Sequence, residues 1–185
     1  DILSIKLPDM IKDLFTIKTT VNNDAYKKYL KGNYLVRVIK DKKSLEESEE
    51  LLRSAIDLDD NFAEAHALLG RHYILLKRYP EATVSLTTAL RLNPNLIWPH
   101  IHLAQAYLED KKYSMALDII NQTIRVNPDN EYAHTILGRI RMATGHYNDA
   151  IFSFKKVLKI NPLDSFHFLE FLNEFEKMSK ITKEN

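Results

Sequence analysis

Apolar residues recur along most of the chain at the spacing of an amphipathic helix. Between residues 65 and 76 they fall three and four positions apart, and residues 77–80 break the pattern. A second apolar stripe follows, with Pro80 in its first turn and Leu86 at its centre, and it ends at Asn93 and Pro94. The pattern predicts two short helices joined by a tight turn, which is a helical hairpin.

This hairpin pattern repeats with a period of 34 residues. The dipeptide Asn-Pro occurs at Asn93, Asn127 and Asn161, and five further positions keep their residue type or size in each unit. These positions are His66, His100 and His134; Leu69, Leu103 and Leu137; Gly70, Ala104 and Gly138; Tyr79, Tyr113 and Tyr147; Ala82, Ala116 and Ala150. Small residues at Gly70 and Ala82 predict a close approach of the two helices of one hairpin.

The residues of the repeat carry a resemblance to a known family. A 34-residue unit with Leu69 and Gly70, then Tyr73, then Ala82 and a closing proline resembles the tetratricopeptide repeat. The resemblance covers residues 63–162 and implies an all-α, right-handed superhelix of helical hairpins. Histidine takes the place of the usual tryptophan at position 66 and its two equivalents, and Arg141 takes the place of the usual tyrosine in the third unit.

The segments around the three regular repeats complete the predicted domain organisation. Residues 1–22 are expected to be a linker or the tail of a preceding domain, and residues 23–60 a divergent hairpin. Residues 61–162 hold the three repeats, and residues 163–185 are expected to form a capping helix and a tail, because the last apolar face of a solenoid needs a cover. About four hairpins and a cap are therefore predicted.

The opening hairpin suggests a wider context. Residues 25–34 and 45–60 resemble the opening repeat of bacterial multidomain regulators, among them winged-helix activators and nucleotide cyclases with a C-terminal repeat domain. The first residue is Asp1 rather than methionine, which leads to the expectation that the chain is a fragment of such a larger protein. The resemblance implies a regulatory module in signalling or transcription regulation.

Composition narrows the function classes. The chain has 26 basic and 25 acidic residues, so overall charge does not favour nucleic acid or an anionic membrane as a partner. It contains no cysteine and no apolar run of about 18 residues, which excludes thiolate sites and predicts no membrane partner for this fragment. A cytoplasmic location is expected, with the periplasm left open. A basic stretch from Lys27 to Lys43 and an acidic one from Glu46 to Glu64 are interpreted as solvated faces rather than docking surfaces.

The sequence offers no candidate for chemistry. His66, His100 and His134 lie one per repeat, too far apart to converge on a metal ion, and are interpreted as half-buried packing residues. The glutamates at positions 46, 47, 49 and 50 are interpreted mostly as a solvated face, with no cleft to shift their pKa values. Motifs of phosphate-binding loops, zinc proteases, calcium loops and serine nucleophiles are absent from the sequence. No catalytic residue, metal or cofactor is predicted, and the chain is not expected to be an enzyme.

The resemblance implies that the first helices of successive repeats line a concave groove. Carried onto this chain, its twelve principal positions are Glu64, Leu68, Arg71, Trp98, Ile101, His102, Gln105, Glu109, Tyr132, Thr135, Arg139 and Met142. Ala67, Leu75 and Ile136 complete the wider set. Such a surface suits a peptide or helix with apolar anchors, and its arginines suit an acidic group. Trp98 is the strongest single candidate. The lysine and asparagine positions of chaperone-binding relatives hold Ala67 and Arg71 here, and the asparagine ladder of sugar-transferase relatives is replaced by Leu68, His102 and Ile136.

The sequence therefore predicts a scaffold that binds a protein or peptide ligand. Two alternatives stay open. One is a homo-oligomerisation module, a homodimer for example, that pairs through residues 166–175 or through the apolar N-terminal segment. The other is the substrate-presenting part of an enzyme whose catalytic domain is absent from this chain.

Overall fold

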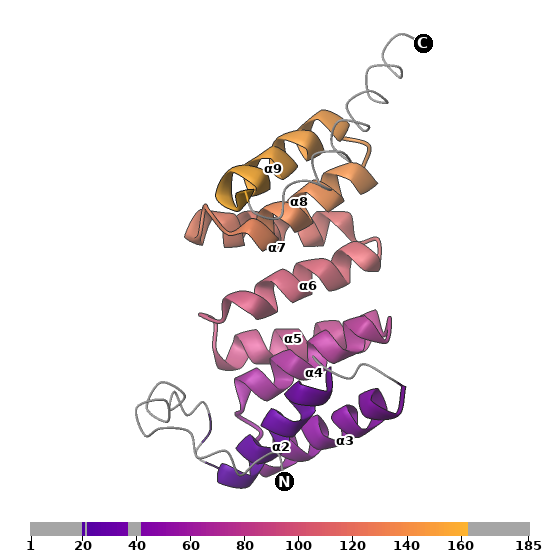
Figure 1. Ribbon diagram of the computed structural model, residues 1–185, viewed down its shortest axis with the longest axis vertical. Coiled ribbons are helices and arrows are strands. Elements are labelled where there is room, and N and C mark those ends of the chain that lie inside the picture. The colour runs from indigo at the N-terminus through magenta and orange to yellow at the C-terminus, as the bar shows by residue number, and fades with distance from the viewer. Residues whose placement is uncertain (1–19, 21, 37–41, 163–185) are drawn as a thin grey trace.

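The computed structural model describes residues 20, 22–36 and 42–162, and these residues form a stack of helices (Figure 1). The eight helices of this part of the chain are α2 (Asn23–Tyr34), α3 (Lys42–Leu58), α4 (Ala63–Leu75), α5 (Tyr79–Leu92), α6 (Ile97–Glu109), α7 (Tyr113–Val126), α8 (Glu131–Ala143) and α9 (Tyr147–Ile160). The predicted capping helix at 163–185 and nearly all of the predicted linker at 1–22 lie outside the described residues.

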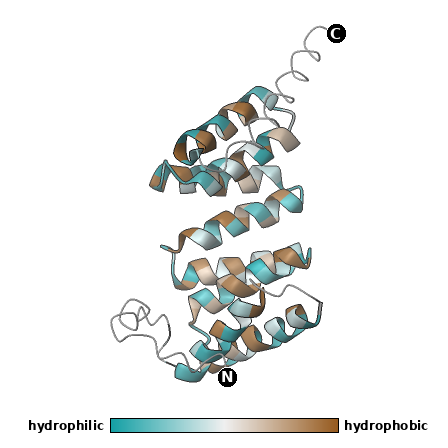
Figure 2. Cartoon of the chain, viewed as in Figure 1, coloured by the Kyte–Doolittle hydropathy of each residue, from teal (hydrophilic) through white to brown (hydrophobic). Residues whose placement is uncertain are grey.

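Consecutive helices pair into four hairpins that follow one another along the long axis of the molecule (Figure 1). Each helix carries both hydrophobic and hydrophilic residues along its length, as expected for amphipathic helices that bury one face (Figure 2). One core cluster joins the first three hairpins through Leu52, Leu69, Leu86 and Leu103. A second cluster, with Ile120 and Ile140 among its members, continues into the fourth. The predicted all-α superhelical fold is confirmed.

The close contact inside each hairpin depends on a small residue of the first helix. A Cβ atom added to Gly70 would lie 2.4 Å from Cγ of Leu86, and one added to Gly138 would lie 2.4 Å from Cε1 of Phe154. Real Cβ atoms do not approach other atoms so closely. The predicted close approach at Gly70 is therefore present, and the same device recurs in the last hairpin.

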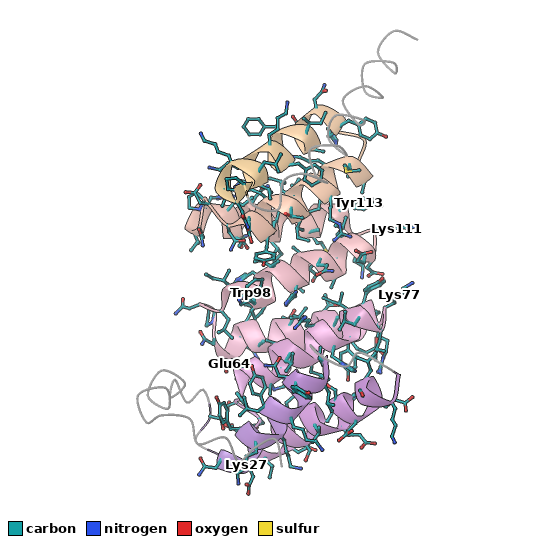
Figure 3. All side chains as sticks on the ribbon, in the orientation of Figure 1. Lys27, Glu64, Lys77, Trp98, Lys111 and Tyr113 are labelled. Atoms are coloured by element: carbon teal, nitrogen blue, oxygen red, sulfur yellow. The ribbon has the colours of Figure 1, made fainter. Side chains whose placement is uncertain are left out.

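The turns within the three regular hairpins share one backbone geometry. Lys77, Lys111 and Gly145 occupy equivalent positions and have φ angles of 58°, 59° and 79°, in the left-handed region. The next residue of each turn donates a backbone hydrogen bond of 2.8 Å to a carbonyl of the preceding helix, as Arg78 does to Tyr73. Lys77 and Lys111 lie on the opposite side of the molecule from Glu64 and Trp98 (Figure 3).

The three repeated histidines are structural. Nε2 of His66 lies 3.1 Å from the carbonyl of Asp60, and Nε2 of His134 lies 2.8 Å from that of Pro128. His100 uses Nδ1 instead, 2.9 Å from the carbonyl of Leu96. Each ring thus ties the start of a first helix to the loop before it. The described residues contain no group of three metal-ligating side chains, and none of their helices is both long and apolar enough to cross a membrane.

Candidate binding groove

A groove of about 550 Å³ runs across the first helices of the four hairpins. Its walls come from α2, α4, α6 and α8, together with the loop before α6. The lining residues are Tyr29, Asn33, Glu64, Ala67, Leu68, Arg71, Leu96, Ile97, Trp98, Pro99, Ile101, His102, Gln105, Tyr132, Thr135 and Ile136. Nine of the twelve principal positions named from the sequence line this one groove.

Two aromatic rings form the centre of the groove. Trp98 lies in the first turn of α6 and Tyr132 in the first turn of α8, one repeat apart, so their side chains meet. Their ring centroids are 4.8 Å apart and the planes make an angle of 64°, an edge-to-face arrangement. Each residue is about half exposed, 52% for Trp98 and 50% for Tyr132. The pair is thus held in place by contact and remains open to a ligand.

His102 is a second aromatic contact of the tryptophan. It lies one helical turn after Trp98, and the two rings stack with centroids 6.1 Å apart and planes 26° apart. Burial, and after it the positive charge of Arg71, lower the pKa of His102 to about 4, although a hydrogen bond with Gln105 acts in the opposite direction. His102 is therefore neutral near pH 7, so the aromatic centre carries no charge of its own.

Three of the twelve principal positions, and Leu75 of the wider set, lie outside this groove. Glu109 and Arg139 form an ion pair between α6 and α8, with Oε1 and Nη2 2.5 Å apart. Met142 packs against the core of the last hairpin, beside Ile151 and Phe154. The structure therefore groups the other nine residues and separates these three, two of which already bind each other.

The groove also includes residues that the sequence analysis did not name. Tyr29 and Asn33 come from α2, in the divergent hairpin, where the resemblance gave no positions to carry over. Leu96, Ile97 and Pro99 surround Trp98 in sequence. Tyr29 and Asn33 could have been found from the helical spacing of Tyr26, Tyr29 and Asn33, which places them on one face of α2.

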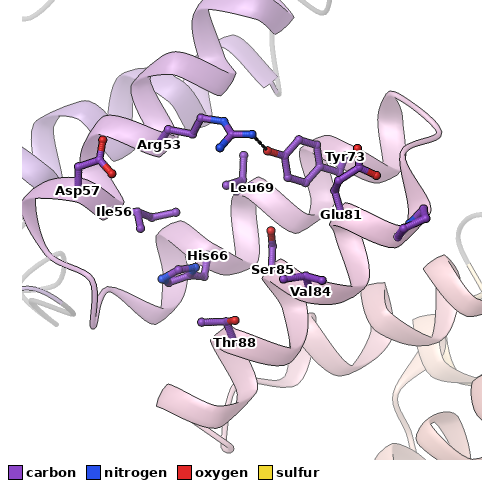
Figure 4. Close-up of a pocket in the computed structure, with 11 residues that line it drawn as sticks. Arg53, Ile56, Asp57, His66, Leu69, Tyr73, Glu81, Val84, Ser85 and Thr88 are labelled. Atoms are coloured by element: carbon purple, nitrogen blue, oxygen red, sulfur yellow. Dashed lines mark hydrogen bonds between the residues drawn. The ribbon is translucent and has the colours of Figure 1, made fainter.

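A second hollow lies between α3 and α5, on the side of the second helices (Figure 4). Its volume is about 540 Å³, and its lining includes Ile56, Leu69, Tyr73 and Val84 with Arg53 and Glu81. In Figure 4 the guanidinium of Arg53 donates a hydrogen bond to the hydroxyl of Tyr73, at 2.7 Å.

Beside this hollow, Glu49 is the acceptor of a polar cluster that joins three helices. It accepts hydrogen bonds from Arg53 on α3, from the hydroxyl of Tyr73 on α4 at 3.1 Å, and from Arg78 at the start of α5 at 3.0 Å. The Arg78 guanidinium also lies 4.5 Å from the ring centroid of Tyr73. Glu49 is only 20% exposed in its side chain, unlike Glu46 and Glu50, so the interpretation of this acidic run as a solvated face holds for its neighbours and not for Glu49.

The electrostatics of the cluster favour a charged Glu49 and a neutral histidine. Burial raises the pKa of Glu49, but hydrogen bonds from Arg53 and Tyr73 and the charges of Arg78 and Arg53 outweigh it, so the pKa is lowered. His72 is fully buried, with Nε2 3.9 Å from Oε2 of Glu49. Burial lowers the pKa of His72, Glu49 opposes the shift, and Arg78 adds to it.

Comparison with known proteins agrees with this architecture. Residues 77–140 match one family model described as a tetratricopeptide repeat, and residues 131–164 match another. None of the curated proteins compared with the chain matches it in sequence.

Solved structures share the fold at low sequence identity. A MamA fragment, 41-end, from Desulfovibrio magneticus RS-1 is 20% identical with a TM-score of 0.69, over 89% of this chain and 92% of that one. A TPR protein of Thermus thermophilus is 16% identical with a TM-score of 0.69, over 84% and 81%. YrrB, described as a TPR protein with an unusual peptide-binding site, is 21% identical with a TM-score of 0.61, over 84% and 76%. With the repeat in the sequence, the stacked hairpins and both family models in agreement, residues 77–164 of the chain belong to the tetratricopeptide repeat family.

Proposed function

We propose that the chain is a protein-binding scaffold whose concave groove holds a peptide or helical segment of a partner protein. We further propose that it serves as the regulatory module of a larger bacterial protein. The observation that carries the binding proposal is the exposed aromatic pair of Trp98 and Tyr132, fixed edge to face inside a groove of about 550 Å³.

Three physical arguments support the binding proposal. Tryptophan and tyrosine are the residues that most often dominate binding energy, because they bury a large area with few rotatable bonds. The rings are already positioned by contact with each other and with His102, so binding does not have to order them. Ile97 is also 41% exposed beside them, which extends the apolar surface.

The test uses the full chain and a random peptide library displayed on phage. Peptides that are selected would be synthesised and titrated while the emission of Trp98 is recorded. Because the chain contains one tryptophan, any change in emission reports on this groove. We expect Trp98→Ala, followed by calorimetry, to weaken binding at least about thirtyfold.

Phe152→Ala is the matched control, since Phe152 is an exposed aromatic residue on α9 that does not line the groove. It should bind the selected peptides as the unmodified chain does. Peptides that bind equally well to both variants would place the binding surface elsewhere and contradict the proposal.

Self-association is a second candidate function. Val126 at the end of α7 is 83% exposed and Phe152 on α9 is 72% exposed, so both side chains offer apolar surface that a second copy would bury. If a second copy covers them, light scattering should show a mass that rises with concentration, and Phe152→Ser should shift the equilibrium toward the monomer. A monomer at all concentrations would exclude this function.

A further inference from the structure

We propose that the groove selects a proline-rich segment in the polyproline II conformation, seated on Trp98 and Tyr132. This inference rests on the proposed function, since it names the class of peptide that the same groove binds. Three features of the groove lead to it: its hydrogen-bond donors, its helical walls and its charge.

Hydrogen-bond donors of the aromatic centre are unused. Neither the indole N–H of Trp98 nor the hydroxyl of Tyr132 is hydrogen-bonded to any described residue, and the same holds for the side-chain amide of Asn33. A tryptophan indole can only donate, and a tyrosine hydroxyl donates readily. The groove thus presents donors at half-exposed rings and calls for a ligand with free acceptors.

The walls of the groove restrict how the backbone N–H and carbonyl groups of a ligand can be hydrogen-bonded. The walls from α2, α4, α6 and α8 are helical. Only their first turns, where Trp98 and Tyr132 lie, have backbone N–H groups without an intrahelical partner, and these do not form the ladder of donors and acceptors that a strand joins. A bound helix has most of its own carbonyls occupied internally and would offer the ring donors few backbone acceptors. A polyproline II segment has no internal hydrogen bonds, so all its carbonyls are free, and its prolines have no N–H that needs a partner.

Ring shape and charge fit the same ligand. An edge-to-face pair at 64° presents two ring surfaces at a steep angle, and proline-rich segments dock on aromatic-lined grooves of this kind with little loss of conformational entropy. Among the lining residues the charged side chains are Glu64 and Arg71, of opposite sign, and His102 is neutral near pH 7. A strongly acidic or basic peptide would therefore gain little from the groove.

The test compares two capped nonapeptides on the full chain. One repeats Pro-Pro-Leu three times, and the other repeats Ala-Ala-Leu, which keeps the leucines and permits a helix. We expect the proline peptide to change the Trp98 emission at a concentration at least about ten times lower than the alanine peptide. Equal or tighter binding of the alanine peptide would overturn the inference.

Two conservative variants test the donors. Tyr132→Phe removes only the hydroxyl, and Trp98→Phe keeps an aromatic ring without the N–H. Each should weaken binding of the proline peptide about tenfold. Binding to Trp98→Phe is measured by calorimetry, because this variant has no tryptophan emission. Tyr34→Phe is the control, because Tyr34 is 51% exposed and outside the groove. Unchanged affinity in Tyr132→Phe and Trp98→Phe would show that the donors are not used and would contradict the proposal.

The library selection separates failure of this inference from failure of the proposed function. Selected peptides that lack proline but still change the Trp98 emission would overturn the polyproline proposal and keep the groove as a binding site. If neither nonapeptide binds, the selected peptides test the inference instead. Proline-rich peptides among them would support it, and peptides without proline would overturn it. If no peptide of any kind changes the emission, both proposals are wrong.

Discussion

At the scale of single residues, the glycines of the first helices are the most sensitive positions of the stack. Gly70→Ala gains helix propensity worth about 1 kcal/mol, but its Cβ would lie 2.4 Å from Leu86, within a core where overpacking costs about 1–3 kcal/mol. We expect a net loss of up to about 2 kcal/mol in the free energy of unfolding, measured by urea denaturation. Gly138→Ala should behave alike against Phe154.

Gly32→Ala is the comparison for this prediction. There the new Cβ would lie 3.1 Å from the flexible side chain of Leu52, so helix propensity and crowding nearly cancel. The change should be within about 0.5 kcal/mol. Equal losses at Gly70 and Gly32 would contradict the role assigned to the close contact.

The second prediction at this scale concerns His102 and pH. Folding lowers the pKa of its imidazole from 6.5 to about 4, so the unfolded chain binds more protons between these values. The contribution of neutral His102 to the free energy of unfolding is complete above pH 6.5. It is lost as the pH falls toward 4, by about 3 kcal/mol in all. Arg71 on α4 and Gln105 on α6 are the groups that act on it, and Trp98 stacks on it.

His102→Gln should therefore flatten the dependence of unfolding free energy on pH between 6.5 and 4. His72, whose pKa is also lowered, acts in the same direction, so His72→Gln should flatten part of the remaining slope below pH 6.5. Urea denaturation at a series of pH values measures both. A slope that is the same with and without His102 would show that its protonation does not destabilise the fold.

At the scale of elements, the Glu49 cluster fixes how α3 meets α4 and α5. Glu49→Gln removes the charge that Arg53 and Arg78 share, and we expect a loss of about 1–2 kcal/mol, below the value for a fully buried pair because Glu49 keeps some contact with water. Glu47→Gln, which breaks an exposed pair with Lys31, should cost at most about 0.5 kcal/mol. Similar losses in both variants would mean that the cluster is no stronger than a surface ion pair.

The elements were more predictable than the contacts between them. The helices and turns of residues 63–162 followed from the 34-residue period, because each repeat position meets the same neighbours in every unit. Glu49 could not be recognised in this way, since its partners Tyr73 on α4 and Arg78 just before α5 lie 24 and 29 residues further along the chain. The acidic residues beside it look alike in sequence, and only packing distinguishes them.

The same reasoning explains how much of the groove was foreseen. Nine predicted positions meet in it because first helices of successive repeats share one face, a property of the repeat itself. The ion pair of Glu109 and Arg139 depends on side-chain reach between α6 and α8, which the period does not encode. Tyr29 was missed because α2 belongs to the hairpin that departs from the period.

At the scale of the whole molecule, each hairpin packs mainly on its neighbours, so stability accumulates along one dimension. A shortened chain of residues 61–185 keeps the three regular hairpins, about the minimum for a stable solenoid. We expect it to stay helical by circular dichroism but to unfold at a lower urea concentration, because Leu69 and Tyr73 lose their cover from α3. Complete loss of helicity would show that the first hairpin is needed for the other three to fold.

The shortened chain also loses part of the groove. Tyr29 and Asn33 would be absent, while Trp98 and Tyr132 would remain. Peptides that depend on the aromatic pair should still change the Trp98 emission, with reduced affinity.

The Glu49 cluster also bears on how such a chain can grow. The junction between α7 and α8 rests mainly on an apolar cluster, and the ion pair of Glu109 with Arg139 that crosses it joins partly exposed side chains. A duplicated hairpin inserted there would therefore meet surfaces largely of the kind it already fits. A hairpin inserted between α3 and α4 would part Glu49 from Tyr73 and Arg78 and leave an acid facing a foreign surface. A change in the number of repeats should thus cost less stability toward the C-terminal end of the stack. At the first hairpin it would break the hydrogen bonds of Glu49 with Tyr73 and Arg78.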